Sequence, residues 1–342
     1  MKRCSLVIAG AVAIGLLAAC TGASSNSRAS STVTTTGNSA VAAGTPNGST
    51  VAAASATAGS SASSASAPVH VKLLNSDGAV YGVGMPVVAY FSAKITDGKD
   101  FSQATTFTVN GQPITGHWYF ESSDQDMISA GYPIQGHFRP DPAAGSATPY
   151  WPANAKIHMD MKTQGVSAGS GMAFDDSLTL SFSTGDAMIS YVDGAAKTMK
   201  VTDNGATVAN YEVSLGKGDT PTYNGTKVVM QLGEDDASGN PRPNGTVMME
   251  GTPVQWSTRV TQSGEYLHAA PWNSAIGQRN LSHGCTNMET ADAKQFYQTY
   301  AHIGDVVIYT NTGGTLMPSW DGYGDWNVSP AVWNAGGVVS MS

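Results

Sequence analysis

The sequence has little charge, few aromatic side chains and almost no cysteine. Charged residues make up 12% of the 342 residues, and the formal net charge is -8. Binding to nucleic acid needs a basic surface, so this balance argues against a nucleic-acid partner and against attraction to membranes through basic patches. The length allows two domains of ordinary size once the low-complexity part near the start is set aside.

The start of the chain lacks an apolar run long enough to span a bilayer comfortably. Lys2 and Arg3 precede an apolar stretch over residues 6–19, which is the pattern of a signal peptide. Leu17-Ala18-Ala19-Cys20 resembles the lipobox of bacterial lipoproteins, in which the cysteine is acylated. We therefore expect residues 1–20 to be a lipoprotein signal peptide, and Cys20 to anchor the protein at the extracytoplasmic face of the cell membrane.

Cysteine is scarce enough to assign each residue of this type. Cys4 lies in the signal peptide and Cys20 is committed to lipid, so Cys285 is the one thiol left in the folded part. An intramolecular disulfide is then impossible. An unpaired thiol is a liability in an oxidising compartment, and its presence there indicates chemistry rather than packing.

Residues 21–68 lack aromatic side chains and carry a single charge, at Arg28. The segment is almost wholly Ser, Ala, Thr and Gly, which cannot build a core. We expect a disordered linker that lets a membrane-anchored protein reach into the cell wall.

Residues 69–185 show short runs typical of strands without helical patterns between them. The predicted strands include Val69–Leu74, Val87–Phe91, Thr106–Val109, Lys156–Met161 and Ser177–Ser183, with a hairpin turn at Asn110-Gly111. This pattern predicts a β-sandwich.

A second, mostly β domain is expected over residues 186–312. Its predicted strands are Lys197–Val201, Ala206–Val213, Lys227–Leu232 and Asp305–Tyr309, with turns at Asn204-Gly205 and Asn224-Gly225. One helix is predicted from about Thr290 to Ala301. The tail, residues 313–342, contains Trp320, Trp326 and Trp333, and we expect it to pack back onto the domains because tryptophan is costly to expose.

The residues with catalytic potential concentrate between His268 and Asn287. A thiol becomes a strong nucleophile when an imidazole takes its proton, and His268 and His283 are both candidates for that base near Cys285. His268 ends an apolar strand that would hold its ring rigidly, so we favour it. Gly284 lets the chain turn tightly beside the thiol, and the amides of His283, Gly284 and Cys285 could form an oxyanion hole for acyl transfer.

The segment Ser282-His283-Gly284-Cys285-Thr286-Asn287, preceded by His268, resembles the signature of the L,D-transpeptidase (YkuD) family. The likeness extends through residues 220–225, 263–264, 268–272 and 321–327. Residues 69–185 are similar to the immunoglobulin-like domain that precedes the catalytic domain in mycobacterial enzymes of this family. The resemblance implies a mainly β protein, with an immunoglobulin-like sandwich followed by a β-rich catalytic domain that has one main helix.

The resemblance also implies roles for individual residues. Cys285 would be the nucleophile, His268 the proton donor and acceptor, and His283 with Gly284 would shape the oxyanion site. Substrate contacts would come from a set spread over the second domain, namely Ser263, Gly264, Trp272, Ser282, Asn287 and Glu250. Residues 234–252 would form a lid. Glu250 stands where close relatives have a tyrosine, Ala269 where the family often has serine, and Thr286 where an apolar residue is usual.

The implied reaction joins two peptidoglycan stem peptides without metal or cofactor. Cys285 attacks the third residue of a tetrapeptide donor, D-alanine leaves, and the side-chain amine of a diamino acid in the acceptor resolves the thioester. β-Lactams such as carbapenems are the implied inhibitors. Two alternatives stay open, namely an L,D-carboxypeptidase in which water is the acceptor and an inactive wall-binding lipoprotein. A zinc peptidase using His268, His283 and Cys285 is disfavoured, because no HExxH-like pair accompanies them.

Overall fold

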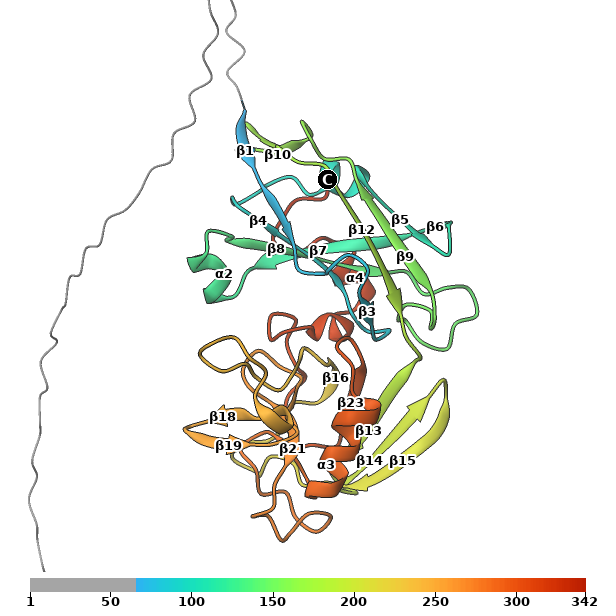
Figure 1. Cartoon of the computed structure of the whole chain (residues 1–342). Coiled ribbons are helices and arrows are strands. Elements are labelled where there is room, and N and C mark those ends of the chain that lie inside the picture. Colours follow the sequence, from blue (N-terminus) through green and yellow to red (C-terminus); the bar gives the residue numbers. More distant parts are fainter. Residues whose placement is uncertain (1–65) are drawn as a thin grey trace, which may run out of the picture. The chain divides into compact units, whose positions relative to one another are not determined.

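The computed structural model describes residues 66–342, which belong to one unit, Ala62–Ser342 (Figure 1). The expected signal peptide, Cys20 and nearly all of the expected linker lie outside the described residues. Within the described part, no helix has both the length and the apolar character needed to cross a membrane.

The first domain is built mainly from two sheets. One has the order β3-β12-β9-β5-β6, and its strands are β3 (Val80–Tyr81), β12 (Leu178–Thr184), β9 (Lys156–Met161), β5 (Thr105–Val109) and β6 (Gln112–Ile114). The other has the order β2-β4-β8-β7, with β2 (Val71–Leu73), β4 (Val87–Phe91), β8 (Ile134–Pro140) and β7 (Gly116–Ser122). Apart from the parallel β3–β12 pair, neighbouring strands in both sheets run antiparallel.

Smaller elements complete this domain. A three-stranded sheet has the order β1-β11-β10, formed by β1 (Ala67–Val69), β11 (Met172–Phe174) and β10 (Ser167–Gly169). Two short helices, α1 (Lys99–Gln103) and α2 (Gln125–Ser129), lie in the connections. Asp124 caps the start of α2 by accepting hydrogen bonds from the amides of Asp126 and Met127.

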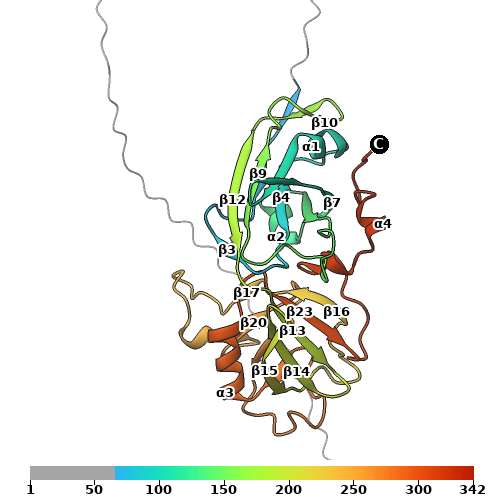
Figure 2. The ribbon, with the colours of Figure 1, turned by 90° about the vertical axis from the view of Figure 1, so that its right-hand side faces the viewer.

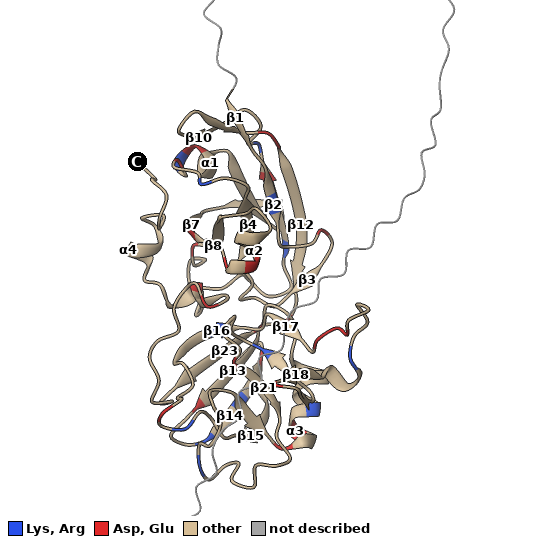
Figure 3. Ribbon diagram, turned by 90° about the vertical axis from the view of Figure 1, so that its left-hand side faces the viewer, with Lys and Arg blue, Asp and Glu red and all other residues tan. Residues whose placement is uncertain are grey.

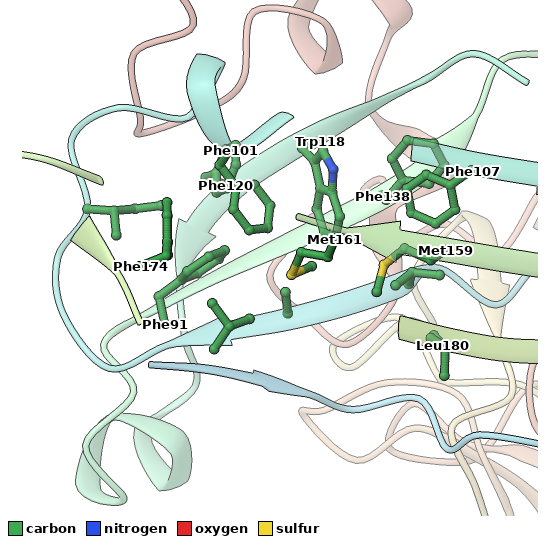
Figure 4. Close-up of a cluster of buried hydrophobic side chains, with 14 of the residues drawn as sticks. Phe91, Phe101, Phe107, Trp118, Phe120, Phe138, Met159, Met161, Phe174 and Leu180 are labelled. Atoms are coloured by element: carbon green, nitrogen blue, oxygen red, sulfur yellow. The ribbon is translucent and has the colours of Figure 1, made fainter. Parts of the chain in front are cut away.

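Aromatic side chains fill the space between the sheets (Figure 4). Phe91, Phe101, Trp118 and Phe120 are each at most 2% exposed, and the Phe107 and Phe138 rings stack at 3.7 Å between centroids. The alternation on β9 explains why this strand could be predicted from the sequence. Its residues Ile157, Met159 and Met161 point inward, while the residues between them do not. The predicted sandwich is thereby confirmed.

The second domain has a central sheet of order β15-β14-β13-β23-β16 (Figure 2). Its strands are β15 (Ala206–Glu212), β14 (Thr198–Asp203), β13 (Met188–Asp193), β23 (Val306–Thr310) and β16 (Gly225–Val228). The β13 and β23 strands pair in parallel although they lie more than 100 residues apart, while the other pairs run antiparallel. The predicted domain boundary at residues 185–186 lies in the connection between β12 and β13.

A second sheet of this domain carries the candidate catalytic segment. Its order is β17-β20-β21-β22, with β17 (Gln231–Leu232), β20 (Thr258–Arg259), β21 (Tyr266–Ala269) and β22 (Thr286–Met288). After the 3₁₀ turn η1 (Pro243–Gly245), β18 (Val247–Met249) and β19 (Thr252–Val254) form a separate hairpin. The predicted helix is α3 (Thr290–Gln295) continued by a π-helical turn, η2 (Phe296–Tyr300).

Two local predictions in this domain are wrong. The run predicted as one strand, Lys227–Leu232, is divided between β16 and β17. Asn224-Gly225 is not a hairpin turn, because Gly225 opens β16. A Cβ on Gly225 would lie 2.5 Å from Oδ1 of Asn327, so the glycine makes room for the tail rather than for a turn.

The tail returns to both domains through η3 (Gly324–Asn327) and α4 (Pro330–Trp333). Trp333 is 1% exposed, stacks on Tyr119 of β7 and donates its indole N–H to the carbonyl of His117. Trp326 donates to the carbonyl of Gly84. Trp320, in contrast, is 61% exposed, so the expectation of packing does not hold for this side chain.

Charged residues are thinly scattered along the described chain (Figure 3). A few of them are nevertheless buried, including Lys227, Glu265, Asp321 and Asp325. Burying a charge is costly unless it is paired, so these positions identify where the fold depends on specific polar contacts.

Candidate active site

The site is organised by the parallel pairing of β21 with β22. His268 lies opposite Asn287 and Leu267 opposite Thr286, and residues opposite each other in a sheet point to the same face. Leu267 and Thr286 are at most 1% exposed and face the core. The other face therefore presents His268 and Asn287, together with Cys285, which precedes Asn287 by two residues.

That face opens into a cavity of about 950 Å³. Its walls include the nucleophile candidate, both histidine candidates and the β18–β19 hairpin. The lining residues are Val247, Met248, Met249, Glu250, Thr252, Val254, Gly264, Tyr266, His268, Trp272, Asn273, Leu281, Ser282, His283, Cys285 and Asn287. The structure thus brings together every residue that the sequence assigned to the site except Ser263 and Gly284.

The His268 ring is held in one orientation by its own strand. Nδ1 lies 2.9 Å from the carbonyl oxygen of Ala269, and a carbonyl can only accept a hydrogen bond. Nδ1 is therefore protonated in the neutral ring, which leaves Nε2 free to accept a proton. Because the partner is a backbone carbonyl, alanine at position 269 does not remove this contact. The Trp272 indole, 60% exposed, stacks at 6.0 Å on the same ring.

Burial keeps both reactive groups neutral at rest. It raises the pKa of the Cys285 thiol to about 11, with a hydrogen bond from the Tyr266 amide acting in the opposite direction. Burial also lowers the pKa of His268, despite its contact with the Ala269 carbonyl. A standing thiolate–imidazolium pair is therefore disfavoured, and His268 is suited to take the proton during nucleophilic attack.

In this resting geometry the thiol does not hydrogen-bond to His268. Among the described residues, the thiol donates to the carbonyl of Gly264 at 3.7 Å, and no hydrogen bond joins it to the imidazole. Catalytic hydrogen bonds are often long or unformed before a substrate binds. Rotation about the Cα–Cβ bond of Cys285 is the movement that would redirect the thiol.

Ser282 fixes the loop that carries the thiol. Its Oγ donates to the carbonyl of Cys285 at 2.5 Å and accepts the amide of Gly284 at 3.1 Å. The expected oxyanion hole of three amides is thus corrected, because the Gly284 amide is already committed. The amides of His283 and Cys285 remain as donors for an oxyanion. Gly284 itself has a φ of +129°, which favours glycine at this turn.

Ser263 has a supporting position rather than a place on the cavity wall. Its amide and hydroxyl both donate to the carboxylate of Asp321, at 2.6 Å each. Asp321 is fully buried, so these bonds fasten the tail beneath the turn at residues 261–265. Gly264, the next residue, reaches the cavity and accepts the thiol contact.

Glu250 lies at the tip of the β18–β19 hairpin and contributes to the cavity wall. Its φ of +50° followed by +80° at Gly251 is typical of a type I′ turn. The hairpin, residues 247–254, overlaps the stretch predicted as a lid, residues 234–252, and both of its strands contribute residues to the cavity that Cys285 lines.

Several contributors were missed from sequence. Tyr266 lines the cavity from two residues before His268, a spacing that strand alternation alone could have indicated. Asn273 lines it too, at 7% exposure. Behind the loop that carries Cys285 lie three further residues, Thr222, Lys227 and Glu265. No local sequence pattern predicts their position, because their partners are distant in sequence.

Among the described residues, one group of side chains has the spacing of metal ligands. It consists of His70, Asp175 and Asp176 in the first domain, all at or near the surface. Exposed acidic groups are common without an ion, and none of the three borders Cys285.

Comparison with known proteins agrees with the two domains and the site described above. Residues 188–308 match the L,D-transpeptidase catalytic domain (YkuD), and residues 28–167 match a bacterial Ig domain. L,D-transpeptidase 2 of Mycobacterium tuberculosis strain CDC 1551 is 32% identical over 282 residues, which cover 79% of this chain and 64% of that protein. L,D-transpeptidase 5 of strain H37Rv is 27% identical, with 80% and 57% covered.

The chain therefore spans less than two thirds of the length of these two curated relatives. Among solved structures, an L,D-transpeptidase in complex with imipenem is 25% identical, with a TM-score of 0.51 and coverage of 70% of this chain and 97% of that one. The order of the domains, the fold and the similar proteins all indicate the same family. Residues 188–308 are therefore an L,D-transpeptidase (YkuD) catalytic domain, preceded in this chain by a bacterial immunoglobulin-like domain.

Proposed function

We propose that the chain is a peptidoglycan L,D-transpeptidase that cross-links the third residues of two stem peptides through a thioester on Cys285. The observation that carries this proposal is the shared cavity of Cys285, His268 and His283, with an imidazole whose Nε2 is free to accept a proton. The relatives named L,D-transpeptidase support the same reaction class.

In the first half-reaction, Cys285 Sγ attacks the carbonyl carbon of the third residue of a tetrapeptide donor. The thiol proton moves to Nε2 of His268, and the carbonyl oxygen becomes an oxyanion that the amides of His283 and Cys285 stabilise. When the carbonyl re-forms, the bond to D-alanine breaks. His268 gives its proton to the leaving amine, and a thioester remains.

In the second half-reaction, the neutral side-chain amine of a diamino acid in the acceptor stem attacks the thioester carbon. His268 takes a proton from that amine, and the thiolate leaves and recovers the proton. The product is an amide between third residues, and the enzyme returns to its starting state without a metal or cofactor. If water replaces the amine, the same steps give an L,D-carboxypeptidase.

The cavity suits a peptide that is partly apolar and partly polar. Met248, Trp272 and Leu281 expose apolar surface around it, while Asn287 and Asn273 offer amide groups. A long stem peptide can lie over the former and hydrogen-bond to the latter. Glu250 is the one carboxylate on the cavity wall, and we assign it to the side where the acceptor enters as an ammonium, which releases one proton to water before the neutral amine attacks.

We also propose that Cys20 is acylated, that the protein works at the extracytoplasmic face of the cell membrane, and that residues 21–68 tether the catalytic domain within reach of the wall. β-Lactams of the carbapenem class are proposed as inhibitors that acylate Cys285. The support is the imipenem complex of a similar structure.

The experiment is mass spectrometry of the purified chain incubated with a disaccharide tetrapeptide, beside the Cys285→Ala variant. A dimer that lacks one D-alanine, formed by the wild type alone, is the expected product. Tripeptide without dimer would move the assignment to carboxypeptidase. Unchanged substrate with an intact thiol would instead favour the inactive wall-binding protein.

A further inference from the structure

A buried ion pair lies directly behind the candidate nucleophile. Lys227 of β16 is fully buried, and its Nζ contacts Oε2 of Glu265, whose side chain is 11% exposed. Neither residue lines the cavity, so substrate cannot reach the pair. Burying two charges is costly, and a hydrophobic pair would serve stability as well or better. The pair therefore calls for an explanation other than packing.

Glu265 connects the pair to the loop that carries the thiol. Its Oε1 accepts the amide of Tyr223 at 2.9 Å and lies 3.5 Å from where a Cβ on Gly284 would be. Its backbone amide donates to Thr261 Oγ1 at 2.8 Å. Glu265 thus supports the underside of Gly284 and also holds the strand that leads to His268.

Lys227 connects the pair to the other side of the thiol. Its Nζ lies 3.8 Å from the centroid of the Tyr309 ring, a cation–π contact. The Tyr309 hydroxyl hydrogen-bonds to Thr286 Oγ1 at 2.8 Å, and Thr286 follows Cys285 in the chain. The two members of the pair therefore reach the residues immediately before and after the nucleophile.

We propose that the Lys227–Glu265 pair is a positioning element for Cys285. The pair fixes the nucleophile loop, residues 282–285, from both sides and sets the charge next to the thiol. Neither residue touches a reacting atom, so both act through the loop. Charge acts on the thiol in opposite directions, because the carboxylate raises the pKa of Cys285 and the ammonium lowers it.

Other ionisable groups also face the thiol or the pair, and they stay unchanged in the test below. They are Tyr266, His268, His283, Tyr309 and Asp321. Burial lowers the pKa of Lys227 and raises that of Glu265, while the attraction between them opposes both shifts. The pair is neutral overall, so removing one member leaves its partner uncompensated near Cys285.

The test is the rate at which iodoacetamide alkylates Cys285 at pH 8 in the full-length chain. Trypsin releases residues 280–294, between Arg279 and Lys294, as one peptide that contains this cysteine, so mass spectrometry reads the site directly. Alkylation needs no transpeptidase activity. A failure of this inference is therefore distinguishable from a failure of the proposed function on which its catalytic meaning rests.

Glu265→Gln should speed alkylation and Lys227→Met should slow it. A nearby charge shifts a pKa by about one unit or more, and the lower nucleophilicity of a more acidic thiol offsets about half of the gain. We therefore expect about a threefold change in each direction. The double variant Lys227→Met/Glu265→Gln should return close to the wild-type rate.

A stability control is available in a second buried pair, His137 with Asp325, neither of which lines the cavity or acts on the pKa of Cys285. Asp325→Asn should lower the melting temperature and leave alkylation unchanged. Faster alkylation in both single variants would indicate a loosened loop and overturn the charge assignment, and unchanged rates in both would overturn the proposal. If Lys227→Met does not fold, the alkylation rate of Glu265→Gln is compared with that of the double variant, and equal rates in these two variants would overturn the proposal.

Discussion

The side-chain hydroxyl of Thr222 donates a hydrogen bond of 2.6 Å to the carbonyl oxygen of Gly284. The same oxygen of Thr222 accepts the amide of Gly216 at 2.9 Å, and the residue is completely buried. One threonine thus satisfies two backbone groups, one of them in the peptide bond that leads to Cys285. Its place 62 residues earlier in the chain shows that the nucleophile loop is held by tertiary contacts.

Replacing Thr222 with valine should destabilise the protein and slow acylation. Valine has a similar shape but leaves a buried carbonyl and a buried amide without partners, at a cost of about 1–3 kcal/mol. Urea unfolding measures the first effect, and the rate of Cys285 acylation by a carbapenem measures the second. Thr222→Ser keeps the hydroxyl and should restore both, whereas a full acylation rate in the valine variant would contradict the role assigned here.

The native thiol should react slowly near neutral pH. Because burial raises the pKa of Cys285 to about 11, the alkylation rate should climb about tenfold per pH unit from pH 8 to pH 10 without levelling off. In urea, the rate at the same cysteine should level off near the ordinary thiol value of about 8.5. A native profile that already levels off near pH 8 would mean that the thiol is activated before substrate binds.

Asn273 should contribute to binding of the donor peptide. Its Oδ1 accepts the Ala275 amide at 3.0 Å, its buried Nδ2 has no partner among the described residues, and the residue itself borders the cavity. A substrate oxygen would satisfy this donor. Asn273→Asp replaces the donor with an acceptor, so we expect about tenfold weaker binding, or about 1.4 kcal/mol.

Calorimetry of tetrapeptide binding in a Cys285→Ala background makes the measurement for Asn273 without turnover. Asn334→Asp adds the same charge at an exposed position and serves as the control. Equal affinities in the two variants would remove Asn273 from the substrate site.

Stability should depend on pH through His137. Burial alone would lower the pKa of this histidine, but the charge and hydrogen bond of Asp325, 2.9 Å away, raise it overall. A raised folded-state pKa gives stabilisation that is complete below the unfolded value of about 6.5 and is lost as pH rises through the folded value. The free energy of unfolding should therefore fall as the pH rises from about 6.5 through the folded-state pKa of His137, and His137→Gln should flatten this dependence.

Breaking this pair with Asp325→Asn should cost about 3–5 kcal/mol at pH 6, because both side chains are buried. The exposed pair His117–Asp141 offers a matched control, and Asp141→Asn should have almost no effect. Urea midpoints at pH 6 and pH 8 provide both comparisons. A large loss in the exposed variant would show that net charge, rather than the buried contact, is responsible.

The strands that were predicted well are those with strict alternation or continuous apolar character. Val87–Phe91 coincides with β4, and the alternation of residues 156–161 coincides with β9. The helix at residues 290–300 was readable because Ala293 and Phe296 repeat on one buried face. Local periodicity carries this information within a few residues.

The parts that could not be predicted depend on partners far along the chain. Lys227 looks like a solvent-facing strand residue, but its partner is Glu265, 38 positions later. Gly225 looks like a turn signal, but it makes room for Asn327. Cys285 and His268 were identifiable by their chemistry, whereas the commitment of the Gly284 amide to Ser282 required coordinates.

The parallel pairing of β21 with β22 places a requirement on how the chain can vary. A slip of one residue between these strands would exchange the faces of their side chains, sending His268 into the core and Leu267 toward the thiol. Insertions within either strand should therefore abolish function, while the connection over residues 271–281 can change length without altering that alignment. The register of β21 against β22 therefore determines whether His268 and Cys285 reach the same cavity. The number of residues between them in the sequence can vary.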